Sequence, residues 1–197
     1  NPRNAIGFAS GASAEHGVAD LRASGSSDGI RGRSASCVYQ LLSTSAAALD
    51  ADLTSFNADG FTLNWTTVNA SSFNLAYIAL GGTDLTNAFA GTFDMGTAST
   101  NLSVTGVGFQ PDLLLMAFSR YDTSTGVNAA AASLGVGVAK SSSSRRCAFE
   151  LGVDGTPSDE QMAQYSDRCL ARITSAQVMS SDADFVSFDS DGFTLDR

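Results

Sequence analysis

The sequence has few of the residues on which many functions depend. Among its 197 residues are 3 Pro, 3 Cys, 1 His and 1 Trp, and 11 Lys and Arg stand against 20 Asp and Glu. A net charge of −9 provides no basic surface to neutralise a nucleic-acid backbone, so DNA and RNA are not expected partners. The longest apolar runs, such as 75–80 and 113–118, are far shorter than the roughly 20 residues that cross a bilayer, so we expect no membrane insertion.

The composition that remains is typical of a folded, β-rich chain. Hydrophobic residues make up 43% and charged residues 16%, which is enough for one large or two small domains. The 19 Gly, with abundant Ser, Thr, Ala and Asn, favour short strands joined by tight turns. The chain begins at Asn1 without the charged and apolar segments of a signal peptide. It is therefore expected to be processed or a piece of a longer polypeptide.

An internal repeat organises the sequence. Residues 37–65 align without gaps with residues 169–197 at a shift of 132 residues, and 12 of the 29 aligned pairs are identical. The longest identical stretch is Asp-Gly-Phe-Thr-Leu, at 59–63 and 191–195. Further upstream the shift is 130, which predicts a loop insertion near 156–165. The period of about 131 residues is a normal size for one domain.

The repeat predicts an all-β chain of two tandem units, at 1–103 and 104–197. Each unit is expected to be an antiparallel β-sandwich of the jelly-roll type. The first unit lacks a counterpart of 109–130, and the second stops at Arg197, where the first continues to Gly82. Either a longer natural polypeptide or outside segments are expected to complete both units, and we favour the longer polypeptide.

Strands are predicted from the spacing of apolar residues. Apolar and polar residues alternate at 61–65 and at 147–153, as in strands with one buried face. The runs at 75–80 and 113–118 are continuously apolar, which predicts central strands covered on both faces.

Two Asp-Gly pairs, Asp59-Gly60 and Asp191-Gly192, predict the turns of β-hairpins. In such turns Gly accepts a positive φ and Asp bonds the local backbone. Carboxylates of the repeated segments could instead supply oxygen ligands for Ca²⁺, although their spacing does not reproduce an EF-hand loop. These weak calcium candidates are Asp50, Asp52, Asp182, Asp184, Asp189 and Asp191.

Histidine and cysteine offer little for catalysis. His16 has no second imidazole to join it in a metal cage and no serine motif for a triad, so we expect it to be exposed at a strand end. Cys37 and Cys169 share a repeat position, whereas Cys147 aligns with Gly17. A disulfide between Cys147 and Cys169 is conceivable, but buried thiols are the favoured interpretation.

Two short motifs carry a family resemblance. The first is Gly-Phe-Gln-Pro-Asp at 108–112, followed by an apolar strand, and the second is 59–65, leading to Tyr-Ile-Ala-Leu-Gly-Gly at 77–82. With them the sequence resembles the repeated β-domains of tailed-bacteriophage virion proteins. The resemblance implies a non-enzymatic structural component on the particle surface, as a capsid decoration, tail or fibre protein. It implies no cofactor and no catalytic residue.

The partners expected from this resemblance are other virion proteins and copies of the same chain, in a symmetric assembly. Aromatic candidates for such contacts are Tyr39, Phe89, Phe93 and Tyr121, and a core position is an equal alternative for each of them. An alternative is a carbohydrate-binding module for host adhesion, in which Trp65 and Asn64 bind a host surface glycan. A glycan hydrolase with paired carboxylates is a third hypothesis that nothing in the sequence requires.

Overall fold

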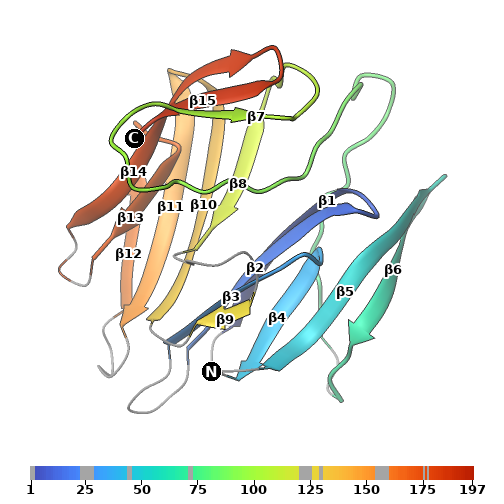
Figure 1. Cartoon of the computed structure of the whole chain (residues 1–197). Coiled ribbons are helices and arrows are strands. Elements are labelled where there is room, and N and C mark those ends of the chain that lie inside the picture. Colours follow the sequence, from blue (N-terminus) through green and yellow to red (C-terminus); the bar gives the residue numbers. More distant parts are fainter. Residues whose placement is uncertain are drawn as a thin grey trace.

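A computed structural model of the chain describes residues 3–22, 29–43, 46–70, 73–119, 126–128, 131–153, 160–174, 176 and 178–197. In these residues fifteen strands and no helix form four small antiparallel sheets (Figure 1). The prediction of an all-β chain is confirmed. Within the same ranges, no helix is long and apolar enough to span a membrane.

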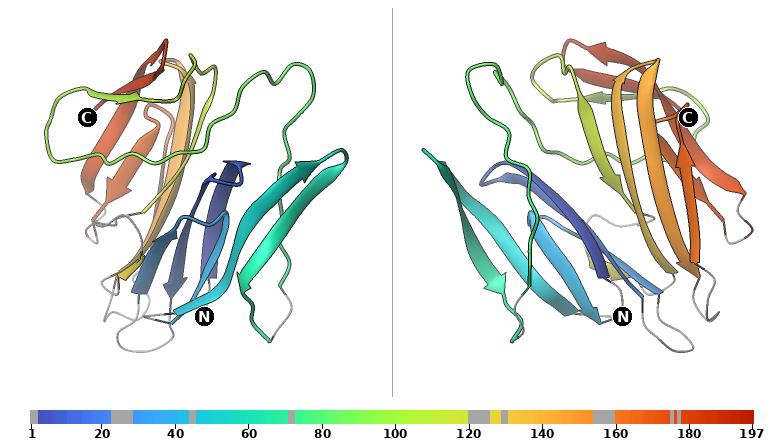
Figure 2. Two further views of the ribbon diagram at one scale, coloured as in Figure 1. Left: turned by 45° about the vertical axis from the view of Figure 1, so that its right-hand side comes forward. Right: turned by 180° about the vertical axis from the view of Figure 1, so that it is seen from behind.

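The strands fall into two groups, joined by a long connection (Figure 2). The first group is β1 (Arg3–Gly11), β2 (Ala14–Arg22), β3 (Gly29–Ser34), β4 (Val38–Ser43), β5 (Ala46–Asn57) and β6 (Gly60–Thr67). The second is β7 (Leu102–Thr105), β8 (Leu114–Phe118), β10 (Ala131–Ser141), β11 (Ser144–Val153), β12 (Glu160–Tyr165), β13 (Leu170–Ile173), β14 (Met179–Asp189) and β15 (Gly192–Asp196). The short strand β9 (Gly126–Asn128) lies between β8 and β10 in the chain but belongs to a sheet of the first group. The four sheets have the orders β1-β2-β3-β9, β4-β5-β6, β12-β11-β10-β8 and β13-β14-β15-β7.

The two groups pair their strands in matching registers. The β1–β2 and β10–β11 ladders coincide at a shift of 130 residues, including a bulge before the turn. The β4–β5–β6 and β13–β14–β15 ladders coincide at a shift of 132, again with bulges at equivalent places. Between them, Gly17 pairs with Ser34 and Cys147 with Tyr165, a shift of 131 for β3 and β12. The second group thus has two extra residues, one before β12 and one after Tyr165. The expectation that a single insertion at 156–165 contains both is wrong.

The predicted Asp-Gly turns are present. Asn57 pairs with Gly60, and Asp189 pairs with Gly192, so a two-residue turn joins each strand pair. Gly192 has φ of +154°, and a Cβ there would overlap the carbonyl O of Val104. Gly60 adopts no positive φ and has open space around it, so the conformational reason given for glycine is wrong at this position.

Glycines also allow a close approach between sheets at two equivalent positions. A Cβ on Gly7 of β1 would overlap the carbonyl O of Cys37, and a Cβ on Gly137 of β10 would overlap the carbonyl O of Cys169. Both glycines lie in strands that β4 or β13 crosses. Only a residue without a side chain fits between the backbones at these points.

The core of each group fills the space between its sheets. The first contains Ala19, Leu21, Ile30, Tyr39 and Leu41, and the second is built on Met116, Ala139, Cys169, Leu170, Ala183, Phe185, Phe193 and Leu195. Ala19 and Tyr39 of the first group align with Phe149 and Ala171, which are also buried. The large and small side chains have exchanged places, which preserves the total volume.

Both predicted central strands are wrong. The run 75–80 forms no strand, and Tyr77, Ile78 and Leu80 are 71%, 88% and 65% exposed. It belongs to residues 73–101, which have no regular structure and lead from the first group to β7 (green in Figure 2). The run at 113–118 contains β8, but β8 ends its sheet and leaves Leu115 exposed, so it is an edge strand. A strand is buried only where other strands lie beside and over it, and the apolar sequence of the segment does not determine whether they do.

The two groups contact each other. β9 pairs with β3 of the first group, and Asn4 Nδ2 donates a hydrogen bond of 2.7 Å to Glu150 Oε1. The expected boundary between residues 103 and 104 falls inside β7.

Candidate functional site

The turn between β14 and β15 places Asp191 against the loop that follows β7. Its carboxylate accepts hydrogen bonds from the backbone N–H groups of Gly106 (3.0 Å) and Gly108 (2.6 Å). Its backbone carbonyl accepts a third, from the N–H of Val107 at 3.1 Å. These donors stabilise the charged form, so they lower the pKa of Asp191. The carboxylate holds the loop in place, a role the sequence analysis missed.

Asp189 is engaged within its own hairpin. It accepts hydrogen bonds from Ser187 Oγ at 2.8 Å and from Thr194 Oγ1 at 2.7 Å. The Thr194 and Ser187 hydroxyls lower the pKa of this carboxylate. The donors to Asp189 thus come from β14 and β15, whereas the donors to Asp191 come from the loop after β7.

Asp182 and Asp184 each face an arginine. Arg145 of β11 binds Asp184 through Nε (2.5 Å) and Nη2 (2.6 Å), a two-point contact. Arg168 Nη1 lies 2.6 Å from Asp182, and its guanidinium lies over the ring of Tyr165. Hydrogen bonding to Asp184 raises the pKa of Arg145. No sequence motif marks these pairs, because both aspartates lie on β14, whereas Arg145 lies on β11 and Arg168 lies between β12 and β13.

The counterparts in the first group differ. Asp50 is half-buried, and its Oδ1 has no hydrogen-bond partner among the described residues. Glu15 is the counterpart of Arg145, and its Oε2 accepts the backbone N–H groups of Leu53 (2.7 Å) and Cys37 (3.2 Å). Asp52, the counterpart of Asp184, is also half-buried. Across the ranges described, no three His, Cys, Asp or Glu side chains gather in a group that could hold a metal ion.

The proposed sugar-binding pair is not brought together. Trp65 is 43% exposed and Asn64 is exposed, both on β6. Successive residues of a strand point to opposite faces. One ligand lying on a single face of β6 therefore contacts either Trp65 or Asn64.

The aromatic contact candidates have different surroundings. Tyr39 lies in the core, and Phe93 packs edge-to-face on Phe193, with ring centroids 5.6 Å apart. Phe89 is exposed, whereas Tyr121 lies outside the described residues. Of the three candidates that lie in described residues, Phe89 is the exposed one.

The three cysteines are free thiols. The Sγ atoms of Cys37 and Cys169 donate to the carbonyls of Ala51 (3.6 Å) and Ala183 (3.4 Å), which are equivalent contacts in the two groups. Burial raises the pKa of Cys37 and Cys169 to about 12 and that of Cys147 to about 11. Such thiols are poor nucleophiles.

His16 lies near the start of β2 and is half-buried, so the prediction of an exposed side chain is wrong. Burial and the charge of Arg33 lower its pKa, and Glu15 acts in the opposite direction. His16 is the one histidine of the sequence, so no second imidazole accompanies it.

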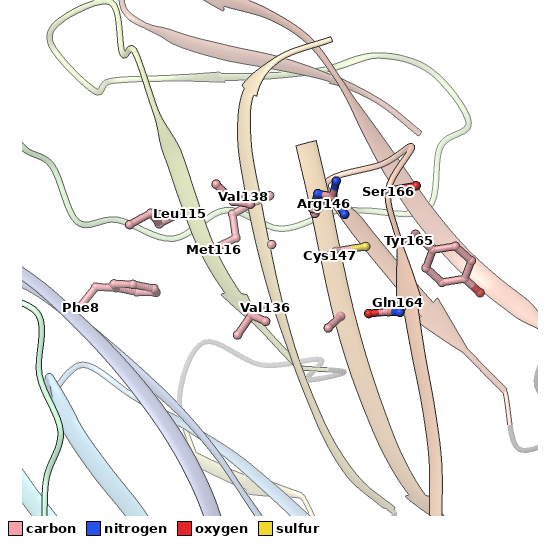
Figure 3. A pocket seen from close by; sticks show the side chains of 12 residues that line it. Phe8, Leu115, Met116, Val136, Val138, Arg146, Cys147, Gln164, Tyr165 and Ser166 are labelled. Carbon is pink, nitrogen blue, oxygen red and sulfur yellow. The ribbon is translucent and has the colours of Figure 1, made fainter. Parts of the chain in front are cut away.

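An open pocket of about 580 Å³ lies between the two groups. Phe8 of β1 faces Leu115, Val136 and Val138 across it, with Arg146 and Gln164 at the other side (Figure 3). A mainly apolar lining with one cation and no paired acid and base offers no catalytic arrangement.

The fold and these contacts define an antiparallel all-β protein in which Asp182, Asp184, Asp189 and Asp191 bind other groups of the same chain. No protein-family model matches the sequence, and no curated protein and no solved structure is significantly similar to it.

Proposed function

We propose that the protein is a non-enzymatic structural component of a bacteriophage virion that acts by self-association, as a capsid decoration, tail or fibre protein. One observation carries the proposal: a run of exposed apolar side chains on the connection between the two groups. This apolar strip consists of Leu75, Tyr77, Ile78, Leu80, Leu85 and Phe89. Soluble monomers rarely expose large apolar patches, and contacts between copies would cover this one.

The architecture proposed with this function is two tandem β-sandwich units of the jelly-roll type. The matching ladders support it, as do the close approaches at Gly7 and Gly137. Further support comes from the packing of β4 across β1 and β2, which parallels that of β13 across β10 and β11. The resemblance of residues 108–112 to phage virion domains suggests the kind of particle.

Sedimentation velocity tests the self-association. We expect the purified chain to form an oligomer that Ile78→Asn weakens, because the substitution places an amide in the covered strip. Val178→Asn changes another exposed β-branched aliphatic residue, outside the strip, and is the matched control. A monomer at all concentrations, or equal effects of the two substitutions, contradicts self-association through the strip.

Cryo-electron microscopy of the source particles tests the virion role. Ordered copies of the paired sheets on a capsid lattice or tail axis are the expected result. Absence of the protein from every particle component overturns this role.

Carbohydrate binding is a second candidate, favoured by the exposed indole of Trp65. Its counterpart in the second group is Arg197, which donates to the carbonyl of Thr100 at 2.8 Å, so only the first group has this aromatic surface. A glycan-array signal that Trp65→Ala removes supports this function, and an array without signal contradicts it.

A further inference from the structure

Residues 102–118 close two sheet edges of the second group at once. β7 pairs with β15, and β8 pairs with β10. The loop between them is held by Asp191 and by Gln110, whose Nε2 donates to the carbonyl of Phe188 at 2.9 Å. We call residues 102–118 the clasp segment.

The residues that receive the clasp segment are repeated in the first group. Phe188, Asp191, Gly192, Phe193, Thr194 and Leu195 correspond to Phe56, Asp59, Gly60, Phe61, Thr62 and Leu63, with identical residues at each position. β6, the counterpart of β15, and β1, the counterpart of β10, both end their sheets. Unpaired strand edges present backbone N–H and C=O groups to any chain that can pair with them.

In the first group, the residues that correspond to those under the clasp segment are more exposed. Phe56 is 59% exposed, whereas Phe188 packs on the core of the second group. Asp59 is exposed, whereas Asp191 binds the clasp loop. Open space surrounds Gly60, at the point where Val104 approaches Gly192.

Neighbouring side chains leave room for a strand on β6. The ring of Tyr77 packs edge-to-face on Phe61, with centroids 5.1 Å apart and an interplanar angle of 82°. Phe93 packs on Phe193 in the same way, at 5.6 Å and 78°, while β7 is paired beside it. A ring at this position is therefore compatible with a bound strand.

The edge of β1 resembles the edge of β10 that binds β8. One difference limits which side chain a strand bound to β1 can carry. β8 pairs with residues 135–139, whose counterparts are 5–9. Gly135 lies against the ring of Phe118, and a Cβ there would overlap it. The first group has Ala5 at this position, so an identical Phe does not fit there in the same rotamer.

We propose that the edges of β6 and β1 bind a clasp-type segment of another polypeptide, with the pattern Thr-Gly-x-Gly-Phe-Gln-Pro-Asp followed by an apolar strand. The clasp segment of a second copy is held by its own second group, so exchange between copies gains no contact. The partner is therefore a segment that is free to add as strands, by β-augmentation. The inference does not depend on the virion role.

The test is a fluorescence-anisotropy titration of the intact chain with a labelled peptide of residues 101–117, which stops before Phe118. We expect saturable binding of one peptide per chain and slower hydrogen exchange at residues 61–63 and 5–9. Asp59→Asn is expected to weaken binding at least about tenfold, because a neutral amide cannot accept both loop N–H groups as a carboxylate does. Asp84→Asn, another exposed aspartate, is the matched control.

A second peptide tests the loop conformation. Gly108 has φ of +85°, so a Gly108→Ala peptide is strained in the bound shape and should bind less tightly. Three results overturn the proposal: no saturation, equal affinity for the chain and its Asp59→Asn variant, or protection at other amides. A peptide-free dimer that Asp59→Asn dissociates also overturns it, because a second copy would then be the occupant.

Discussion

The carboxylate of Asp191 accepts the backbone N–H of Gly108 across 2.6 Å, although 83 residues separate them in sequence. This contact and its neighbour from Gly106 bind the first strands of the second group to its last hairpin. The identical Asp59 in the first group is exposed. Asp59 and Asp191 therefore have the same local sequence but different surroundings, so comparing them isolates the effect of the bound loop.

Asp191→Asn is expected to lower the melting temperature at pH 7 by several degrees, and Asp59→Asn is expected to leave it unchanged. The pKa of Asp191 is lowered in the folded state, so its contribution is complete above the unfolded value of about 3.9. The contribution is lost as the pH falls through the lower folded pKa. Thermal unfolding from pH 7 to pH 2 should therefore show the difference from the natural chain shrink below about pH 4. A difference that persists unchanged at pH 2 contradicts the carboxylate's role.

Gly137→Ala is expected to destabilise the protein by roughly 1–3 kcal/mol, because the new methyl group overlaps the carbonyl of Cys169. Gly11→Ala is the control, since nothing lies within 4 Å of a Cβ at that position. Its counterpart, Ser141, already carries a side chain in the same bulge. Urea unfolding measures both, and equal midpoints for the two variants would show that the sheets separate easily.

The three thiols are expected to react slowly in the native protein. With pKa values of about 11 to 12, each thiolate is scarce at pH 8. Reaction with an aromatic disulfide reagent should be at least about a hundredfold slower than for free cysteine. In denaturant all three thiols should react promptly, and a missing thiol there would indicate a disulfide.

Leu195→Ala is expected to cost about 2–5 kcal/mol, because Leu195 is fully buried in the core and its strand, β15, is paired with β7. Leu63→Ala should cost clearly less, because among the described residues no strand pairs with β6 as β7 pairs with β15, and Leu63 is only half-buried. Calorimetric or denaturant unfolding of the two variants measures this asymmetry. Equal decreases in the free energy of unfolding would contradict the difference in burial between Leu63 and Leu195.

Several local features could be predicted from the sequence because they depend on neighbouring residues. The alternation at 147–153 placed Cys147, Phe149 and Leu151 on the buried face of β11. The Asp-Gly pairs marked two hairpin turns, since the turn geometry is set within a few residues. The sequence identified the aspartates that are calcium candidates but not their partners, because Arg145 comes from β11 and Arg168 from the loop between β12 and β13.

The sequence by itself determined the all-β class, through short alternating segments separated by turn residues. Only the tertiary structure decided which strands are covered. Leu75 to Leu80 is as apolar as the segment that contains β8, yet it is exposed because, among the described residues, no strand pairs with it. Asp59 and Asp191 have the same local sequence but different roles, because a carboxylate binds a distant loop only where the chain brings that loop to it. Hydrogen bonds and burial between strands need a partner in space, and that partner is not encoded in the local pattern.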